Sequence, residues 1–164
     1  MGTQQKVEVT GYENLVPIYE TYVTNGTLVV KFRNDYFNIR NSNIRVRIEV
    51  PQLSSTSLNG SGEITIRDFI GSNLSVTING SGNIYSSNCS YNYLYAKVNG
   101  SGHLRATNIS TNTSEAEISG SGTIDVTASQ KLKARISGSG EINYYGNPAA
   151  TDIQVSGSGH VRKK

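Results

Sequence analysis

The stretch ISGSGEINYYGN, residues 136–147, contains a Gly-Ser-Gly turn that occurs six times in this sequence of 164 residues. Aliphatic residues flank every copy, as in LNGSGEI at 58–64 and VNGSGHL at 98–104. The first glycines of the turns are Gly60, Gly80, Gly100, Gly120, Gly138 and Gly157, so successive turns are 20, 20, 20, 18 and 19 residues apart. A nearly constant spacing of this size is typical of a solenoid, in which each repeat packs on the next.

The residues on both sides of each turn alternate between apolar and polar, as they do in a half-buried strand. Two residues before and four residues after the first glycine, every position is aliphatic in all six copies. Extending the pattern outward in steps of two adds further aliphatic residues, for example Leu74, Val76 and Ile78. A helix would space them by three or four residues, and the glycines would interrupt it. We therefore predict an all-β fold, a parallel β-helix with coils of about 20 residues.

Stacking the coils in register makes predictions for the corners and for the outer face. The six glycine corners are expected from the architecture alone, because glycine adopts backbone angles that a side chain forbids and leaves room for the next corner. On the outer face, Glu117 would lie between Lys97 and Arg135, Glu115 beside Lys133, and Arg105 beside Asp125. Asn59, Asn79 and Asn99 recur at one position and are placed to form a ladder of side-chain amides.

The first fifty residues lack the Gly-Ser-Gly turn but keep a β pattern. Two apolar or alternating runs flank Asn25-Gly26, a strong hairpin signal, and apolar residues alternate again over 44–50. The segment 34–43 between them is predicted to be a loop. We assign residues 1–6 to a disordered start or one added for expression, with a native export signal removed. Residues 7–164 are assigned to a single β-helix domain, with opening coils and the hairpin at 7–52 and six Gly-Ser-Gly coils at 53–164.

Composition and spacing argue against several kinds of function. The net charge of +3 is small and the basic residues are dispersed, so we expect no binding of nucleic acid. No run is apolar enough to span a membrane, and the single cysteine, Cys89, is predicted to be a structural thiol. No carboxylate recurs at one position of the turns, and His103 and His160 lie three coils apart, too far to share a metal ion. We expect no metal site and no cofactor.

Catalysis would need a cluster of acids or bases, and the best carboxylate pair is Glu115 with Glu117 on one strand face. Lysine and arginine surround this pair in the predicted stacking. A general acid needs a raised pKa, which such neighbours oppose. We therefore interpret the pair as part of a charge ladder and predict no catalytic residue.

Tyrosine is the surface feature that stands out. Tyr91, Tyr93 and Tyr95 alternate along one strand, and Tyr85 lies on the strand before it. Exposed aromatic side chains stack on sugars and anchor protein partners, so these four residues form the candidate binding patch. The alternative interpretation is that tyrosine suits strands and simply shields a sheet face.

The ordered combination of these segments resembles the head GIN domain family of putative auto-transporter adhesins. The resembling features are the repeated ISGSGxI turns, ENL followed by TYVTNGTLVVKF, VRIEVPQLSSTSLNGSGEI, and the closing LKARISGSGEINYYGNPAATDIQVSGSGHV. The likeness covers roughly residues 7–162. It implies a right-handed, single-stranded β-helix in a bacterial cell-envelope or secreted setting, and it supplies no catalytic or binding residues.

Our leading interpretation is a non-enzymatic, exported binding or structural module that is secreted, periplasmic or on the bacterial surface. Its expected partner is a surface glycan or an envelope protein. One alternative is a carbohydrate-active enzyme, of the polysaccharide lyase or glycosidase type, on the same scaffold. A second is a structural envelope protein that forms homo-oligomers through the solenoid ends, where strands lie unpaired.

Overall fold

The computed structural model describes residues 5–33 and 43–164. These residues form two compact units, Met1–Pro51 and Gln52–Lys164, which are described in turn below. The predicted loop at 34–43 lies, except for its last residue, outside the described residues. The assignment of both units to a single domain stays a prediction.

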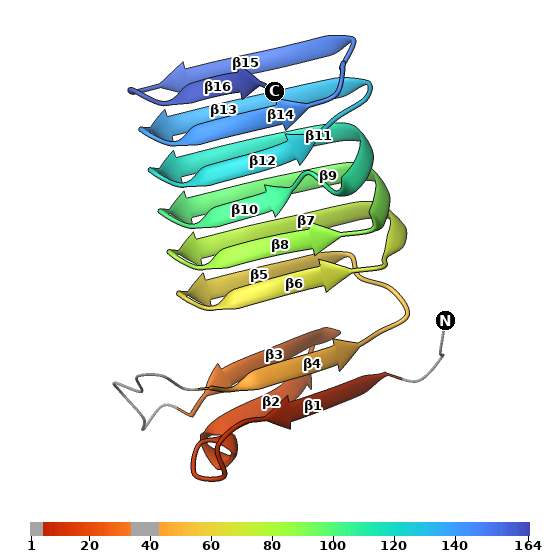
Figure 1. The fold of residues 1–164 in the computed structure, drawn as a ribbon, viewed down its shortest axis with the longest axis vertical. Helices are drawn as coiled ribbons and strands as arrows, with labels where there is room; N and C mark the ends of the chain where they lie inside the picture. Colours follow the sequence, from red (N-terminus) through yellow and green to blue (C-terminus); the bar gives the residue numbers. More distant parts are fainter. Residues whose placement is uncertain (1–4, 34–42) are drawn as a thin grey trace. The chain divides into compact units, whose positions relative to one another are not determined.

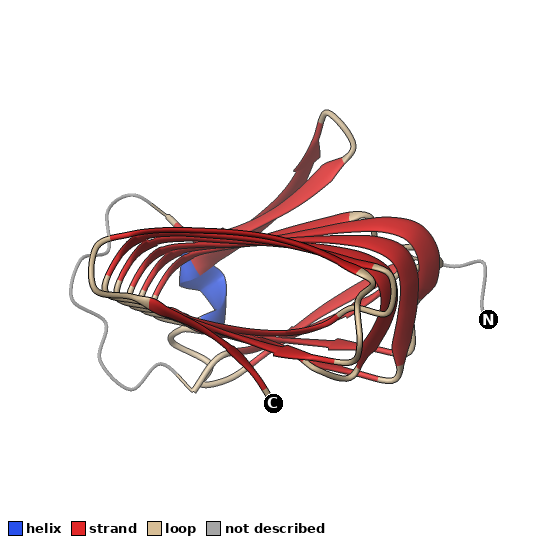
Figure 2. Cartoon of the chain, turned by 90° about the horizontal axis from the view of Figure 1, so that it is seen from above, coloured by secondary structure: helices blue, strands red, loops and turns tan. Residues whose placement is uncertain are grey.

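The unit from Gln52 to Lys164 is a β-solenoid, as the repeat predicted (Figure 1). Two six-stranded parallel sheets face each other across its core, and the corners of each coil join them (Figure 2). The even-strand sheet contains β6 (Glu63–Arg67), β8 (Asn83–Ser87), β10 (His103–Ala106), β12 (Thr123–Thr127), β14 (Glu141–Tyr145) and β16 (His160–Lys163). The odd-strand sheet contains β5 (Ser55–Gly60), β7 (Ile70–Gly80), β9 (Cys89–Gly100), β11 (Ile109–Gly120), β13 (Lys131–Gly138) and β15 (Ala150–Ser156).

The core of the solenoid consists of columns of aliphatic side chains, one from each coil. In the even-strand sheet, Ile84, Leu104 and Ile124 are paired in register, and each is at most 1% exposed. Burying such a side chain contributes roughly 1.5–3 kcal/mol before the entropy of ordering is subtracted. The columns are most accessible at the edge strand β15, where Ile153 and Val155 are 45% and 42% exposed.

The Gly-Ser-Gly corners interlock from coil to coil. All six first glycines have a positive φ, between 110° and 133°. The carbonyl oxygen of Gly60 accepts hydrogen bonds from the backbone N–H groups of Ser81 and Gly82, both 3.0 Å long, and Gly80 accepts the same pair from the following coil. Because these corners use polar backbone groups to bind the neighbouring coil, the turns have a structural role.

The unit from Met1 to Pro51 consists of antiparallel pairs and a short helix. β2 (Tyr19–Thr24) and β3 (Thr27–Phe32) form a hairpin whose turn residues have the left-handed φ values of 48° at Asn25 and 73° at Gly26. The hairpin is therefore present at the predicted position.

The strand predicted over 44–50 is present as β4 (Arg45–Glu49), which pairs antiparallel with β1 (Lys6–Thr10). The expectation of parallel coils in this segment was therefore wrong for the described strands. This segment lacks the Gly-Ser-Gly corner that joins the two parallel sheets in the other unit.

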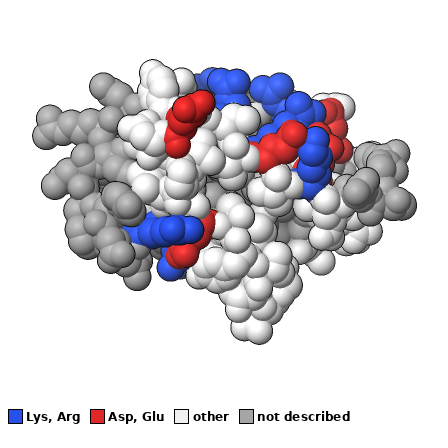
Figure 3. Space-filling view, turned by 90° about the horizontal axis from the view of Figure 1, so that it is seen from below, with Lys and Arg blue, Asp and Glu red and all other residues white. Residues whose placement is uncertain are grey.

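The helical part of the described chain is η1 (Val16–Ile18), a single 3-10 turn whose Ile18 is buried. No helix among the described residues is long and apolar enough to cross a membrane. On the face drawn in Figure 3, lysine and arginine lie next to aspartate and glutamate. Ion pairs such as Lys31 with Glu20, 2.9 Å apart, account for this mixing of charge.

Candidate functional site

The outer face of the odd-strand sheet carries the predicted ladder of charges. Glu117 lies in register between Lys97 and Arg135, and Glu115 pairs with Lys133. The Lys97 ammonium is 3.6 Å from the Glu117 carboxylate, while Arg135 instead contacts Asp152 at 3.2 Å. The carboxylates proposed as the best acid pair are thus bound to cations, as the ladder interpretation requires.

The same face also holds the amide ladder. The side-chain amide of Asn79 donates to Asn59 and that of Asn99 donates to Asn79, each at 2.8 Å. These bonds link three coils along the corner of the sheet. The prediction of an amide ladder is confirmed.

Tyr93 and Tyr95 lie on this outer face of β9, but their hydroxyl groups are engaged. Tyr93 Oη donates to Glu115 at 2.8 Å and Tyr95 Oη donates to Glu117 at 2.7 Å. Burial, reinforced by these carboxylate acceptors, raises the pKa of both tyrosines to about 12. Both side chains are therefore neutral donors that tie neighbouring coils together.

Two members of the predicted tyrosine patch lie elsewhere. Tyr91 is only 3% exposed, packs on Gly71, and donates its hydroxyl to the Leu53 carbonyl at 2.8 Å, so it was wrongly placed on the surface. The reason is a corner at Asn92, which interrupts the alternation between Tyr91 and Tyr93. Tyr85 belongs to β8 of the opposite sheet, where its ring meets His103 edge-on at 6.5 Å. The four tyrosines do not form one patch.

A polar groove lies on the outer face of the even-strand sheet, where the repeat becomes irregular. In the first two coils, Asp68 and Asn88 adopt left-handed φ values of 62° and 53°, and the Asn88 amide donates to Asp68 at 2.6 Å. Asn108 holds the same place in the next coil but lacks this conformation, and β10 ends one residue early, at Ala106. The side-chain bond between Asp68 and Asn88 is not continued at Asn108, and the groove lies at this interruption.

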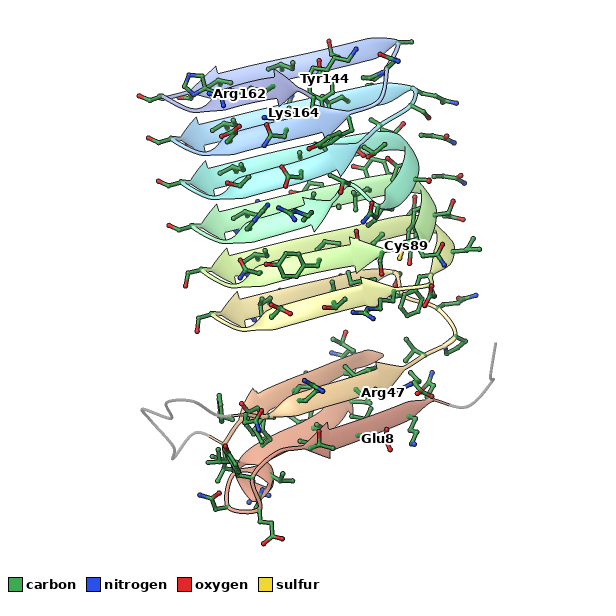
Figure 4. All side chains as sticks on the ribbon, in the orientation of Figure 1. Glu8, Arg47, Cys89, Tyr144, Arg162 and Lys164 are labelled. Atoms are coloured by element: carbon green, nitrogen blue, oxygen red, sulfur yellow. The ribbon has the colours of Figure 1, made fainter. Side chains whose placement is uncertain are left out.

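The groove has a volume of about 450 Å³ and crosses three consecutive coils. We call it the even-sheet groove. Its lining consists of Arg105, Thr107, Asn108, Asp125, Thr127 and Tyr145. Tyr145 is 37% exposed at the end of β14, whereas the preceding Tyr144 packs against the core (Figure 4).

Asp125 organises the polar side chains of this groove, and it is 7% exposed. Its Oδ2 accepts from His103 Nε2 at 2.8 Å and lies 3.6 Å from Arg105 Nε, while its Oδ1 accepts from Asn143 Nδ2 at 3.0 Å. The predicted contact between Arg105 and Asp125 is confirmed. Both carboxylate oxygens are occupied, so Asp125 orients its neighbours.

A buried hydrogen-bond cluster lies at the end of β12, next to the groove. Ser114 replaces the leucine of the neighbouring coils, is fully buried, and donates to the Thr127 carbonyl at 2.7 Å. Thr111 donates to the same carbonyl, and the Thr127 hydroxyl donates to the Thr107 carbonyl at 2.9 Å. The cluster therefore holds in place two residues that line the groove.

Cys89 is a free cysteine, 4% exposed, whose Sγ lies 3.3 Å from the Ser87 carbonyl oxygen. Within residues 5–33 and 43–164, His, Cys, Asp and Glu form no group of three that could hold a metal ion.

The model of the family described as putative auto-transporter adhesin, head GIN domain, matches residues 1–148 of the chain. The chain belongs to this family. The comparison with curated proteins found no match.

Crystal structures of other proteins share the fold of this head GIN domain chain. A putative adhesin from Bacteroides fragilis aligns with a TM-score of 0.74 at 20% identity, over 99% of this chain and 84% of that one. A putative lipid binding protein from Parabacteroides distasonis aligns with a TM-score of 0.55 at 23% identity, over 98% and 84%. A putative adhesin from Parabacteroides merdae aligns with a TM-score of 0.56 at 20% identity, over 98% of this chain and 83% of that one. The family and two of these neighbours are named putative adhesins, and the neighbours show that the fold is shared.

Proposed function

We propose that this head GIN domain is a non-enzymatic, exported glycan-binding module of the adhesin type, and that the even-sheet groove holds the glycan. The observation that carries the proposal is the position of Tyr145, an accessible aromatic ring beside Arg105 and Asn108. Sugar sites combine an aromatic ring, which packs on the apolar face of a pyranose, with planar polar groups that bind its hydroxyls. The adhesin names of the family and of two solved structures support a role at the cell surface.

The polarity of the groove favours a glycan over a lipid. Five of its six lining residues are polar or charged, and Tyr145 is the single aromatic one. An acyl chain would leave those polar groups without hydrogen-bond partners, at a cost for each of them. We therefore do not propose lipid binding for this chain, although one of the solved structures is named a putative lipid binding protein.

The test is an array of bacterial and host glycans, probed with the wild-type domain, Tyr145→Ala, and Tyr93→Ala/Tyr95→Ala. We expect saturable binding by the wild type that Tyr145→Ala abolishes and the double variant keeps. Loss in the double variant alone would move the site to the odd-strand sheet. Absence of binding by the wild type would overturn the proposal and leave an envelope protein as the partner to seek. Thermal unfolding of each variant confirms that it folds.

A further inference from the structure

The even-sheet groove presents one side chain whose charge is not fully used within the protein. The Arg105 side chain is 56% exposed, and its Nε contacts Asp125 at 3.6 Å. Among the described residues, its contact with Asp125 is through Nε and none of the side-chain hydrogen bonds involves its Nη atoms, while Arg105 lines the groove. A guanidinium held by Nε keeps its outer nitrogens free for a second, planar acceptor.

The acids around Arg105 are already bound. Asp125 accepts a hydrogen bond from His103 on one carboxylate oxygen and from Asn143 on the other. On the same sheet, Glu141 accepts a hydrogen bond from Arg162 at 3.1 Å. Because these carboxylate oxygens already accept hydrogen bonds from other side chains, the outer nitrogens of Arg105 remain available to a planar acceptor of a ligand.

Resting on the proposed function, we infer that the glycan recognised by the even-sheet groove is acidic, with a sugar carboxylate bound by Arg105. An arginine fork matches a carboxylate with two parallel hydrogen bonds, and such charge-assisted bonds are among the strongest that proteins make. Tyr145 then packs on the ring of the same sugar or of its neighbour, and Asn108 binds a hydroxyl group. Asp125 is a positioning residue, because it contacts Arg105 and does not face the ligand with a free oxygen.

The experiment measures binding of oligogalacturonate and of its methyl ester, which keeps the sugar rings but removes the charge. The second pair of probes is 3′-sialyllactose and lactose. We expect at least one acidic probe to bind and its neutral counterpart to bind at least about tenfold more weakly. Raising the NaCl concentration should lower the affinity for the acidic probe and not for the neutral one, because salt screens the exposed ion pair between Arg105 and the sugar carboxylate.

Variants assign the effect to one side chain. Arg105→Ala should lower affinity for the acidic probe at least about tenfold. Arg105→Lys should keep only part of the wild-type affinity, because an ammonium lacks the two parallel N–H donors of a guanidinium. Asp125→Asn should weaken binding of the acidic probe more than binding of the neutral probe, because Asp125 positions Arg105. The matched control is Arg67→Ala, which removes an exposed cation from β6 of the same sheet, outside the groove, and should bind as the wild type does.

The outcomes separate the two proposals. Equal binding of acidic and neutral probes, abolished by Tyr145→Ala, would overturn the acidic ligand and retain the glycan site. Unchanged binding of the acidic probe by Arg105→Ala would also overturn this inference. Absence of binding to every glycan, with the variants folded, would overturn the proposed function together with the inference.

Discussion

Gly100 lies directly on Gly80, so closely that a Cβ atom added to Gly100 would be 2.4 Å from the Gly80 carbonyl oxygen. That oxygen is the acceptor that holds the next corner, through hydrogen bonds of 3.0 Å from Ser101 and Gly102. The corner therefore excludes a side chain twice, by its positive φ of 128° and by this contact.

Gly100→Ala and Gly60→Ala separate these two effects. Gly60 has a φ of 110° but meets nothing within 4 Å of an added Cβ, since it belongs to the first corner of the stack. We expect Gly60→Ala to lower the free energy of unfolding by about 1–3 kcal/mol from backbone strain, and Gly100→Ala to lower it clearly more. Urea unfolding measures both. Equal losses would contradict the role given to coil stacking.

Ser114→Ala should destabilise the solenoid, because it removes one of the two side-chain donors to the buried Thr127 carbonyl. The expected loss is about 1–3 kcal/mol in the free energy of unfolding. Ser110→Ala makes the same change at an exposed position of β11 and should stay within about 0.5 kcal/mol of the wild type. A harmless Ser114→Ala would show that Thr111 alone satisfies the carbonyl.

The tyrosines predict a loss of stability at high pH. Tyr91, Tyr93 and Tyr95 each have a pKa raised to about 12, mainly by burial, above the ordinary value of 10. A raised pKa means that the folded state binds the proton more tightly, so this contribution is complete below pH 10 and is lost as the pH rises towards 12.

Ultraviolet titration of tyrosinate checks this expectation, together with unfolding measured between pH 9 and pH 12. Tyr93→Phe/Tyr95→Phe should remove two of the late-titrating groups and flatten the fall in stability. Ordinary titration of all tyrosines near pH 10 in the folded protein would contradict the burial and bonding described for them.

The amide ladder gives a graded prediction. Asn79 takes part in two side-chain bonds and Asn99 in one. Because the ladder is exposed, each bond is expected to contribute about 0.5 kcal/mol, so Asn79→Ala should cost about twice as much as Asn99→Ala. Thermal unfolding of the two variants, at one salt concentration, tests the ratio. A larger effect of Asn99→Ala would show that the amides act separately.

The sequence predicted the solenoid and much of its outer face because both follow from repetition. The spacing between turns, 20 residues for one pair and 18 for the other, placed Arg105 beside Asp125 and Glu115 beside Lys133. In a parallel stack, the neighbours of a residue are its counterparts one coil away, so register alone determines them.

The candidate site was missed for the same reason. The even-sheet groove exists where the repetition fails, at Thr107 and Asn108, and periodicity says nothing about a position that departs from it. The spacing from Gly100 to Gly120, which contains these two residues, is the regular 20 residues, so it carried no signal of the groove. Tyr91 was misplaced by a corner that period-2 alternation does not include.

The irregular corner at Asn108 also bears on how a long polymer could be held. Along a perfectly regular stack every coil offers the same contacts about 4.8 Å apart, so a repeating ligand would bind equally well in many shifted positions and slide between them. An interruption in one coil makes that coil different from the others and so provides a single preferred binding position. A chain bound there can transmit a pulling force to the protein instead of slipping along it.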